Sequence, residues 1–210
     1  MKPLRINRMA LSPLIWNLIA PNGIRDFYFK EDEAALIEQA DYKTGTLSTL
    51  DAGELRAIVE AFEPKVVAEV GTYIGRSTRA MAAGMPGDGN FIYTCDGSND
   101  IELPRMYGAT VEQFPKTTST EMFRELVERE IKVDMFYIDG RLNKDDGALM
   151  AELNPQALIV LDDFEGIEKG VHNAMLLLSG AYPGHVLVYP RESCKTAILI
   201  PPAALQFVSQ

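Results

Sequence analysis

Short apolar runs without polar alternation, separated by stretches of helical periodicity, restrict the fold more than any other feature of the sequence. The four clearest runs are Val66–Val70, Phe91–Cys95, Val133–Ile138 and Ala157–Leu161. Strands that lack a polar face are covered on both sides, which is typical of parallel sheets whose strands are joined by helices. Two later runs, Val186–Tyr189 and Thr196–Ile200, are separated by a short polar segment and predict an antiparallel hairpin.

The segments between these runs repeat apolar residues at helical spacing. Asp51 and Glu54 form a capping-box pattern that opens a helix extending to Phe62. Further helices are predicted over Arg76–Ala83, Thr118–Glu130, Asp145–Leu153 and Ile167–Leu178. We therefore predict an α/β fold, a Rossmann-like doubly wound and mostly parallel sheet with helices on both faces and an antiparallel C-terminal hairpin.

The 210 residues are predicted to divide into an N-terminal arm or cap segment, residues 1–44, and one α/β domain, residues 45–210. Residues 1–30 hold five basic residues and one acidic residue, together with Trp16 and the aromatic cluster Phe27–Phe29. These features fit an arm that covers a ligand site, contacts a second copy or touches a membrane surface. They fit an additional helix packed on the sheet equally well.

Charge and hydropathy exclude several classes of protein. The formal net charge of -10 argues against nucleic acid as a partner, because phosphate binding needs a basic surface. The longest apolar run, Met9–Ala20, is interrupted by Pro13 and is shorter than the ~20 residues of a membrane-spanning helix. Cys95 and Cys194 lie in apolar runs typical of buried free thiols. The sequence thus predicts a cytoplasmic protein with no membrane span.

A turn with two glycines follows the first apolar run, in the sequence Glu69-Val-Gly71-Thr-Tyr-Ile-Gly75-Arg-Ser77. Gly71 and Gly75 let the backbone turn tightly and approach a ligand, and the helix that follows presents unpaired amide groups. Tyr73 stands where a dinucleotide-binding motif has its second glycine, which disfavours a nicotinamide cofactor.

Asp96 follows the second apolar run and lies 25 residues beyond Gly71. At that place in a Rossmann-type sheet, a carboxylate accepts hydrogen bonds from the ribose hydroxyls of a nucleoside. The alternative is a local turn, in which Asp96 bonds the backbone near Gly97. The spacing of Gly71 and Asp96 favours an adenosine-containing cofactor.

These motifs resemble those of the class I S-adenosylmethionine-dependent methyltransferases. VVAEVGTYIGRST is similar to the first motif of the family, FIYTCD to its second, and TTSTEMFREL to its third. The resemblance, which extends from about Gly45 to Ile200, implies that S-adenosylmethionine is bound by Glu69, Gly71, Thr72, Tyr73, Gly75, Ser77, Asp96, Ser119 and Asp139. The chain departs from the family between Asp96 and Val111, where little room remains for a crossover helix and Pro104 disfavours one.

Three carboxylates follow the next two strands: Asp139 after Ile138, and Asp162 and Asp163 after Leu161. Because the ends of adjacent parallel strands share one crevice, these acids repel one another unless they are protonated or bind a hard cation such as Mg²⁺. The set resembles that of metal-dependent O-methyltransferases of the macrocin, novobiocin and catechol types, where the counterparts of these three aspartates hold the metal. Each of the three could instead cap a helix or serve only the fold.

A methyl acceptor must lose a proton, and the candidate catalytic groups are Asp139 and Lys144. For Lys144 a solvated surface position is the alternative. Arg141 lies where the sugar-methylating relatives have an acid, so it either binds an acidic substrate group or pairs with Asp139 in place of the metal.

The leading hypothesis is a metal-assisted O-methyltransferase that uses S-adenosylmethionine to methylate a hydroxyl group on a small molecule. The alternatives are a metal-independent methyltransferase, a catalytically silent methyltransferase-like interaction domain and, third, a nicotinamide oxidoreductase. The resemblance also implies pairing of two copies, since relatives often form homodimers.

Overall fold

The structure is a computed structural model, and it describes residues 32–40, 45–85, 87–98, 101–164, 166–188 and 195–205. Trp16, the cluster Phe27–Phe29 and Cys194 lie outside these residues. Contacts between residues divide the chain into two units. The described residues of Leu18–Thr118 form what we call the N-terminal unit, and those of Ser119–Gln210 form the C-terminal unit.

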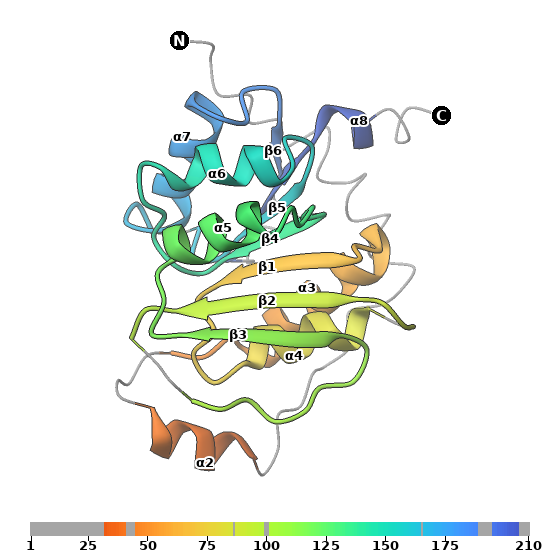
Figure 1. The fold of residues 1–210 in the computed structure, drawn as a ribbon, viewed down its shortest axis with the longest axis vertical. Coiled ribbons are helices and arrows are strands. Elements are labelled where there is room, and N and C mark those ends of the chain that lie inside the picture. Colours follow the sequence, from red (N-terminus) through yellow and green to blue (C-terminus); the bar gives the residue numbers. More distant parts are fainter. Residues whose placement is uncertain are drawn as a thin grey trace. The chain divides into compact units, whose positions relative to one another are not determined.

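The N-terminal unit contains three parallel strands and the helices that connect or flank them (Figure 1). Its elements in chain order are α2 (Asp32–Gln39), α3 (Thr49–Phe62), β1 (Val66–Val70), α4 (Arg76–Gly84), β2 (Phe91–Asp96) and β3 (Thr110–Pro115). β1 spans the residues predicted for it, whereas β3 was not predicted. None of the described residues between β2 and β3 is helical, as the departure from the family pattern indicated.

The C-terminal unit contains two parallel strands followed by an antiparallel pair. Its elements are α5 (Ser119–Glu128), β4 (Met135–Ile138), α6 (Asp146–Leu153), β5 (Leu158–Leu161), α7 (Gly170–Ser179), β6 (Val186–Val188), β7 (Ala197–Ile200) and α8 (Pro202–Leu205). β4 and β5 are parallel, and β7 runs antiparallel to both β5 and β6. The predicted C-terminal hairpin is therefore confirmed.

The strands of the described residues follow the order β3-β2-β1 within the N-terminal unit and β4-β5-β7-β6 within the C-terminal unit. β4 and β5 are parallel neighbours, and α6 connects them in the chain. The three elements therefore form a βαβ unit. The prediction of an α/β fold with a mostly parallel sheet that ends in an antiparallel pair is confirmed. No helix in the described part of the chain is long and apolar enough to cross a membrane.

The capping box of α3 lies three residues earlier than predicted. Ser48 is the N-cap, and its hydroxyl oxygen accepts a hydrogen bond from the Asp51 amide at 3.1 Å. The same hydroxyl donates to Asp51 Oδ2 at 2.5 Å, so Asp51 is the third residue of the helix and the partner of the N-cap, and it does not open the helix. The pairing of Asp51 with Glu54 was wrong, because an acid three residues after a serine fits the motif better than an acid three residues after an acid.

Glycine and an apolar cluster bring the helices of the N-terminal unit close to their neighbours. A Cβ atom at Gly84 would lie 2.8 Å from the Arg56 carbonyl oxygen of α3, so only glycine lets α4 approach α3 this closely. Leu36 of α2, from the predicted arm, is buried against Ile74 and Ile101. Part of the predicted arm therefore packs on the turn that follows β1.

Candidate active site

The turn from Gly71 to Gly75, which follows β1, holds three residues in the left-handed region. Gly71 has φ +99°, Tyr73 φ +44° and Gly75 φ +75°. The amides of Gly71 and Thr72 both donate to the carbonyl oxygen of Cys95, at 2.9 and 3.2 Å. A non-glycine residue in this region costs on the order of 1 kcal/mol, so the hydrogen bonds to the end of β2 stabilise a backbone that is otherwise unfavourable.

Glu69 joins the end of β1 to the first turn of α4. Its carboxylate is buried and accepts hydrogen bonds from Ser77 Oγ and Thr78 Oγ1, each at 2.5 Å. Burial raises the pKa of the Glu69 carboxyl from 4.5 to about 7, although the two hydroxyl donors act in the opposite direction. Glu69 and Ser77, both predicted to bind the cofactor, bind each other here and so fix where α4 begins.

Asp96 connects β2 to the same turn. Its Oδ2 atom accepts a hydrogen bond from the Tyr73 amide at 2.8 Å, and its Oδ1 accepts from the amide and the hydroxyl of Ser98 at 3.0 and 3.2 Å. The bond to the Ser98 amide is the local turn considered as an alternative. The bond to Tyr73 brings Asp96 and the glycine turn together, as their spacing in the sequence predicted.

Leu103 packs directly over Gly75. A Cβ atom at Gly75 would lie 2.4 Å from Leu103 Cδ2, so the glycine makes room for a protein side chain. Gln113 of β3 holds this segment, since its Oε1 accepts from the Leu103 amide and its Nε2 donates to the Ile101 carbonyl, both at 2.9 Å. Sequence reasoning did not identify Gln113, because β3 itself was not predicted.

Ser119, predicted to bind S-adenosylmethionine, donates its hydroxyl hydrogen to Oδ2 of Asp146 at 2.6 Å. The same carboxylate, which is fully buried, accepts from Thr120 Oγ1 at 2.5 Å and from the Asn143 amide at 2.7 Å. Asp146 therefore ties the start of α5 to the loop that follows β4. From the sequence, Asp146 was predicted only as part of a helix, and the serine 27 residues and the threonine 26 residues before it carried no signal of this contact.

Asp139, Asp162 and Asp163 come together at the ends of β4 and β5, as predicted from their positions after adjacent parallel strands. Ile138 and Leu161 are paired in the register of these strands, and the Asp162 amide donates to the Ile138 carbonyl at 3.0 Å. Asp162 Oδ2 accepts a hydrogen bond from the Tyr137 hydroxyl at 3.1 Å. Burial and the neighbouring Asp162 raise the pKa of Asp139 to about 7.

A lysine lies among these acids. Lys169 Nζ is 2.8 Å from Asp163 Oδ2 and 3.3 Å from Asp139 Oδ1, and its side chain is 44% exposed. Burial alone would lower the pKa of Lys169, but Asp139 and Asp163 outweigh burial and raise it to about 12. Of the two alternatives for Arg141, pairing with Asp139 is not the one found among the described residues: the cation that contacts Asp139 is Lys169, and Arg141 is exposed. Binding of an acidic substrate group by Arg141 stays a prediction.

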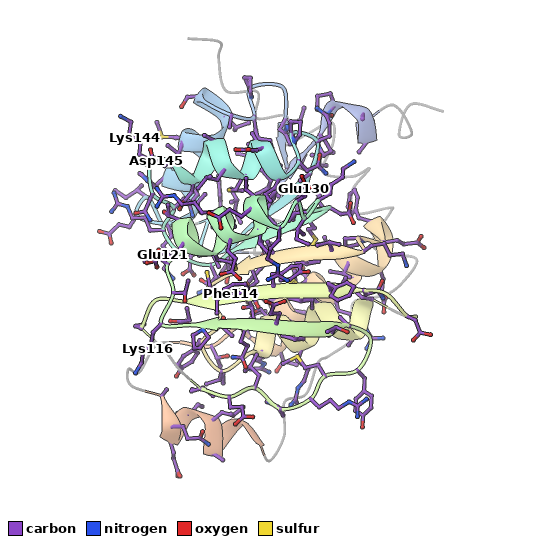
Figure 2. The ribbon with its side chains drawn as sticks, in the orientation of Figure 1. Phe114, Lys116, Glu121, Glu130, Lys144 and Asp145 are labelled. Carbon is purple, nitrogen blue, oxygen red and sulfur yellow. The ribbon has the colours of Figure 1, made fainter. Side chains whose placement is uncertain are left out.

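Asn173 of α7 holds the loop that follows Asp139. This fully buried side chain accepts a hydrogen bond from the Leu142 amide at 3.0 Å and donates to the Gly140 carbonyl at 2.8 Å. Lys144, the second candidate catalytic group, is exposed in the turn that precedes α6, and Figure 2 shows it beside Asp145 at the outer edge of that turn. Helix α7 thus supplies a positioning residue that sequence reasoning missed.

The fold can be compared with known proteins. No protein-family model and no curated protein matches the chain. The O-methyltransferase TomG from Streptomyces achromogenes, involved in tomaymycin synthesis and solved in complex with S-adenosylmethionine, aligns over 92% of this chain and 99% of its own, with a TM-score of 0.57 and 12% identity. The O-methyltransferase from Bacillus cereus, in complex with S-adenosylhomocysteine, aligns over 81% of this chain and 87% of its own, with a TM-score of 0.55 and 15% identity. The chain has the fold and strand order of the class I S-adenosylmethionine-dependent methyltransferases.

Proposed function

We propose that this chain is an S-adenosylmethionine-dependent methyltransferase that acts on a hydroxyl group of a small molecule. The two structural neighbours are named as O-methyltransferases, but their identity of 12% and 15% supports the fold alone. The observation that carries the proposal is the hydrogen bond between the Tyr73 amide and Asp96, which joins the strained turn after β1 to the carboxylate after β2. This contact places the carboxylate after β2 beside the turn after β1, and these are the two features with which sheets of this type bind a nucleoside.

The groups of the N-terminal unit suit S-adenosylmethionine. Asp96 is the carboxylate for the ribose hydroxyls, and the turn from Gly71 to Gly75 brings the backbone close to the ligand. Among the described residues no side chain caps the N-terminus of α4, so this helix start is suited to an anionic group such as the carboxylate of the methionyl part. When bound, S-adenosylmethionine supplies a methyl group on an electrophilic sulfonium.

The role of the protein is then to position the acceptor and to receive its proton. Orienting two reactants supplies much of the acceleration in such a substitution. Asp139 is the carboxylate proposed to take the proton from the acceptor hydroxyl, since it is partly exposed and has a pKa of about 7. Lys144 carries no comparable support, because it is exposed in the turn before α6 and Asp139 pairs with Lys169 instead.

The acidic cluster does not fit a divalent metal as the family resemblance implied. Mg²⁺ requires oxygen ligands at about 2.1 Å in octahedral geometry, and an ammonium group next to such an ion is repelled. Lys169 Nζ contacts both Asp139 and Asp163, the two half-buried members of the expected ligand set. No group of three acidic, histidine or cysteine residues within the described ranges is arranged to hold a metal ion. The reaction proposed for this chain therefore contains no metal-dependent step.

Calorimetric titration with S-adenosylhomocysteine tests the proposal directly. Binding of one molecule per chain, followed by transfer of a labelled methyl group to a hydroxylated acceptor from a panel of small molecules, is the expected result. An absence of binding would favour the catalytically silent domain, and binding of NADH in its place would favour an oxidoreductase.

A further inference from the structure

Lys169 is placed by the backbone and not only by attraction to its partners. Gly170 follows it, and a Cβ atom at that position would lie 2.6 Å from Phe164 Cα and 2.7 Å from the Asp162 carbonyl oxygen. Only glycine lets the start of α7 approach the segment after β5 this closely. The Asn173 amide donates to the Lys169 carbonyl at 2.8 Å, which fixes Lys169 at the first turn of α7. The lysine side chain therefore starts from a fixed point beside the acids.

The charge of the cluster also requires a cation. Asp139, Asp162 and Asp163 bring three carboxyl groups to the ends of two neighbouring strands, and Asp162 and Asp163 both disfavour the ionised form of Asp139. The Lys169 ammonium is the group that opposes this effect. The loop after β4 has two basic residues, Arg141 and Lys144, and the side chains of both are exposed. The cluster is thus partly neutralised from within the chain.

Within the part of the chain that the structure describes, the ammonium has two acceptors, which leaves one donor for a ligand. A lysine ammonium carries three N–H groups, and Lys169 directs two of them to Asp139 and Asp163. Since 44% of its side chain is exposed, the third N–H has access to an oxygen atom of a bound molecule. An ammonium at this place supplies what a metal ion supplies in related sites, namely a positive charge beside the acceptor oxygen.

We propose that Lys169 is the resident cation of the acidic cluster and takes the place of a divalent metal, so that it binds the acceptor oxygen and makes the chain independent of metal ions. The part of this inference that concerns the acceptor oxygen rests on the proposed function. The occupancy of the cluster by Lys169 is a separate matter, and it can be tested without cofactor or substrate.

The test measures binding of Mn²⁺ to the full chain. Electron paramagnetic resonance gives the concentration of the ion that stays free. We expect no binding by the wild-type chain and binding of one Mn²⁺ per chain by Lys169→Ala, because removal of the ammonium frees the Asp139 and Asp163 carboxylates to turn toward an ion that they are not arranged to hold in the wild type. Asp163→Asn in the Lys169→Ala background should remove the new site. Lys132→Ala, a change of an exposed lysine in the same unit, is the matched control and should bind no Mn²⁺.

Two results would overturn the proposal. One is binding of Mn²⁺ by the wild-type chain that Asp163→Asn abolishes, and the other is a folded Lys169→Ala chain that binds no Mn²⁺. If Lys169→Ala fails to fold, Mn²⁺ binding by the wild-type chain still tests the proposal. Lys169→Arg, which keeps the positive charge, then replaces Lys169→Ala and should bind no Mn²⁺.

Activity gives a second readout. We expect turnover by the wild-type chain to be unchanged in excess EDTA and to fall roughly 10²-fold in Lys169→Ala, the loss typical of removing one donor to a developing charge. Added Mg²⁺ should restore part of the activity of Lys169→Ala only, which a purely structural role for Lys169 does not explain. Inhibition of the wild type by EDTA contradicts the proposal. Failure to bind S-adenosylhomocysteine contradicts the proposed function instead, and leaves the Mn²⁺ result valid.

Discussion

The backbone amide of Tyr73 donates to Oδ2 of Asp96 at 2.8 Å, across 23 residues of sequence. Tyr73 has a positive φ of 44°, so this bond helps to hold a conformation that tyrosine rarely adopts. One carboxylate therefore has two tasks: it stabilises the turn after β1, and in the proposed function it binds the ribose of the cofactor.

Replacing Asp96 separates these tasks. Asp96→Ala removes the acceptor for the Tyr73 amide and should lower the free energy of unfolding by about 1–3 kcal/mol, the usual cost of leaving a buried donor unpaired. It should also abolish binding of S-adenosylhomocysteine in a calorimetric titration. Asp96→Asn keeps one carbonyl oxygen for Tyr73, so it should preserve more stability than affinity. Asp88→Asn changes an exposed acid of the same unit and should affect neither quantity.

Glu69 makes stability depend on pH. Its carboxyl ionises near 4.5 in the unfolded chain, whereas in the folded chain its pKa is about 7. Between these values the folded state holds more protons, so the free energy of unfolding should fall as the pH rises from about 4.5 to about 7, by on the order of 3 kcal/mol for this group.

Glu69→Gln removes this titration and retains the shape of the side chain. Urea unfolding at several pH values between 4.5 and 8 should therefore show a flatter profile for Glu69→Gln than for the wild type. Equal slopes in the two proteins would mean that Glu69 ionises normally in the folded state.

Two glycines of the C-terminal unit give opposite predictions. Gly170→Ala places a Cβ atom 2.6 Å from Phe164 Cα and should lower the free energy of unfolding by about 1–3 kcal/mol. In Gly147→Ala the nearest atoms, on Ala181 and Leu177, are at 3.7 Å, and the site is within α6. The free energy of unfolding of this second variant should rise by ~0.5–1 kcal/mol, because alanine favours the helix. Thermal unfolding of both variants provides the comparison.

Asn173 offers a test of loop positioning. Asn173→Ala should leave the Leu142 amide and the Gly140 carbonyl without their partner, at a cost of about 1–3 kcal/mol. Faster hydrogen exchange at the Leu142 amide, together with lower turnover, is the expected outcome. His172→Ala, one position earlier in α7, should leave the exchange rate at Leu142 as it is in the wild type.

Elements with a clear physical signal could be predicted from the sequence. β5 and all of β1 except the half-buried Val66 are buried, and both strands consist of apolar residues apart from Glu69, so their patterns identified them. β3 is mostly half-buried or exposed and contains Glu112 and Gln113, so its residues do not differ from those of a loop. Its parallel pairing with β2 comes from the tertiary structure and leaves no local pattern.

The candidate site divides in the same way. Asp96 and the three aspartates after β4 and β5 were identified because parallel strands bring their carboxyl ends to one edge. The residues that were missed lie at the beginnings of helices in the C-terminal unit: Asp146 at the start of α6, and Lys169 and Asn173 at the start of α7. Their distances along the sequence from the residues that they contact depend on how the helices pack, so no local pattern shows them. Lys169, six residues beyond Asp163, belongs to no motif. The only signal in the sequence is that it is a single basic residue after several acidic ones.

The covalent attachment of Lys169 has a consequence for how such a protein would respond to its surroundings. A metal ion occupies its site to an extent set by its free concentration, which a chelator or a competing protein changes. A side chain anchored by Gly170 and Asn173 is present once in every folded molecule, at an effective concentration that dilution does not alter. The positive charge among these acids is therefore a covalent part of the chain and does not depend on the concentration of any ion in solution.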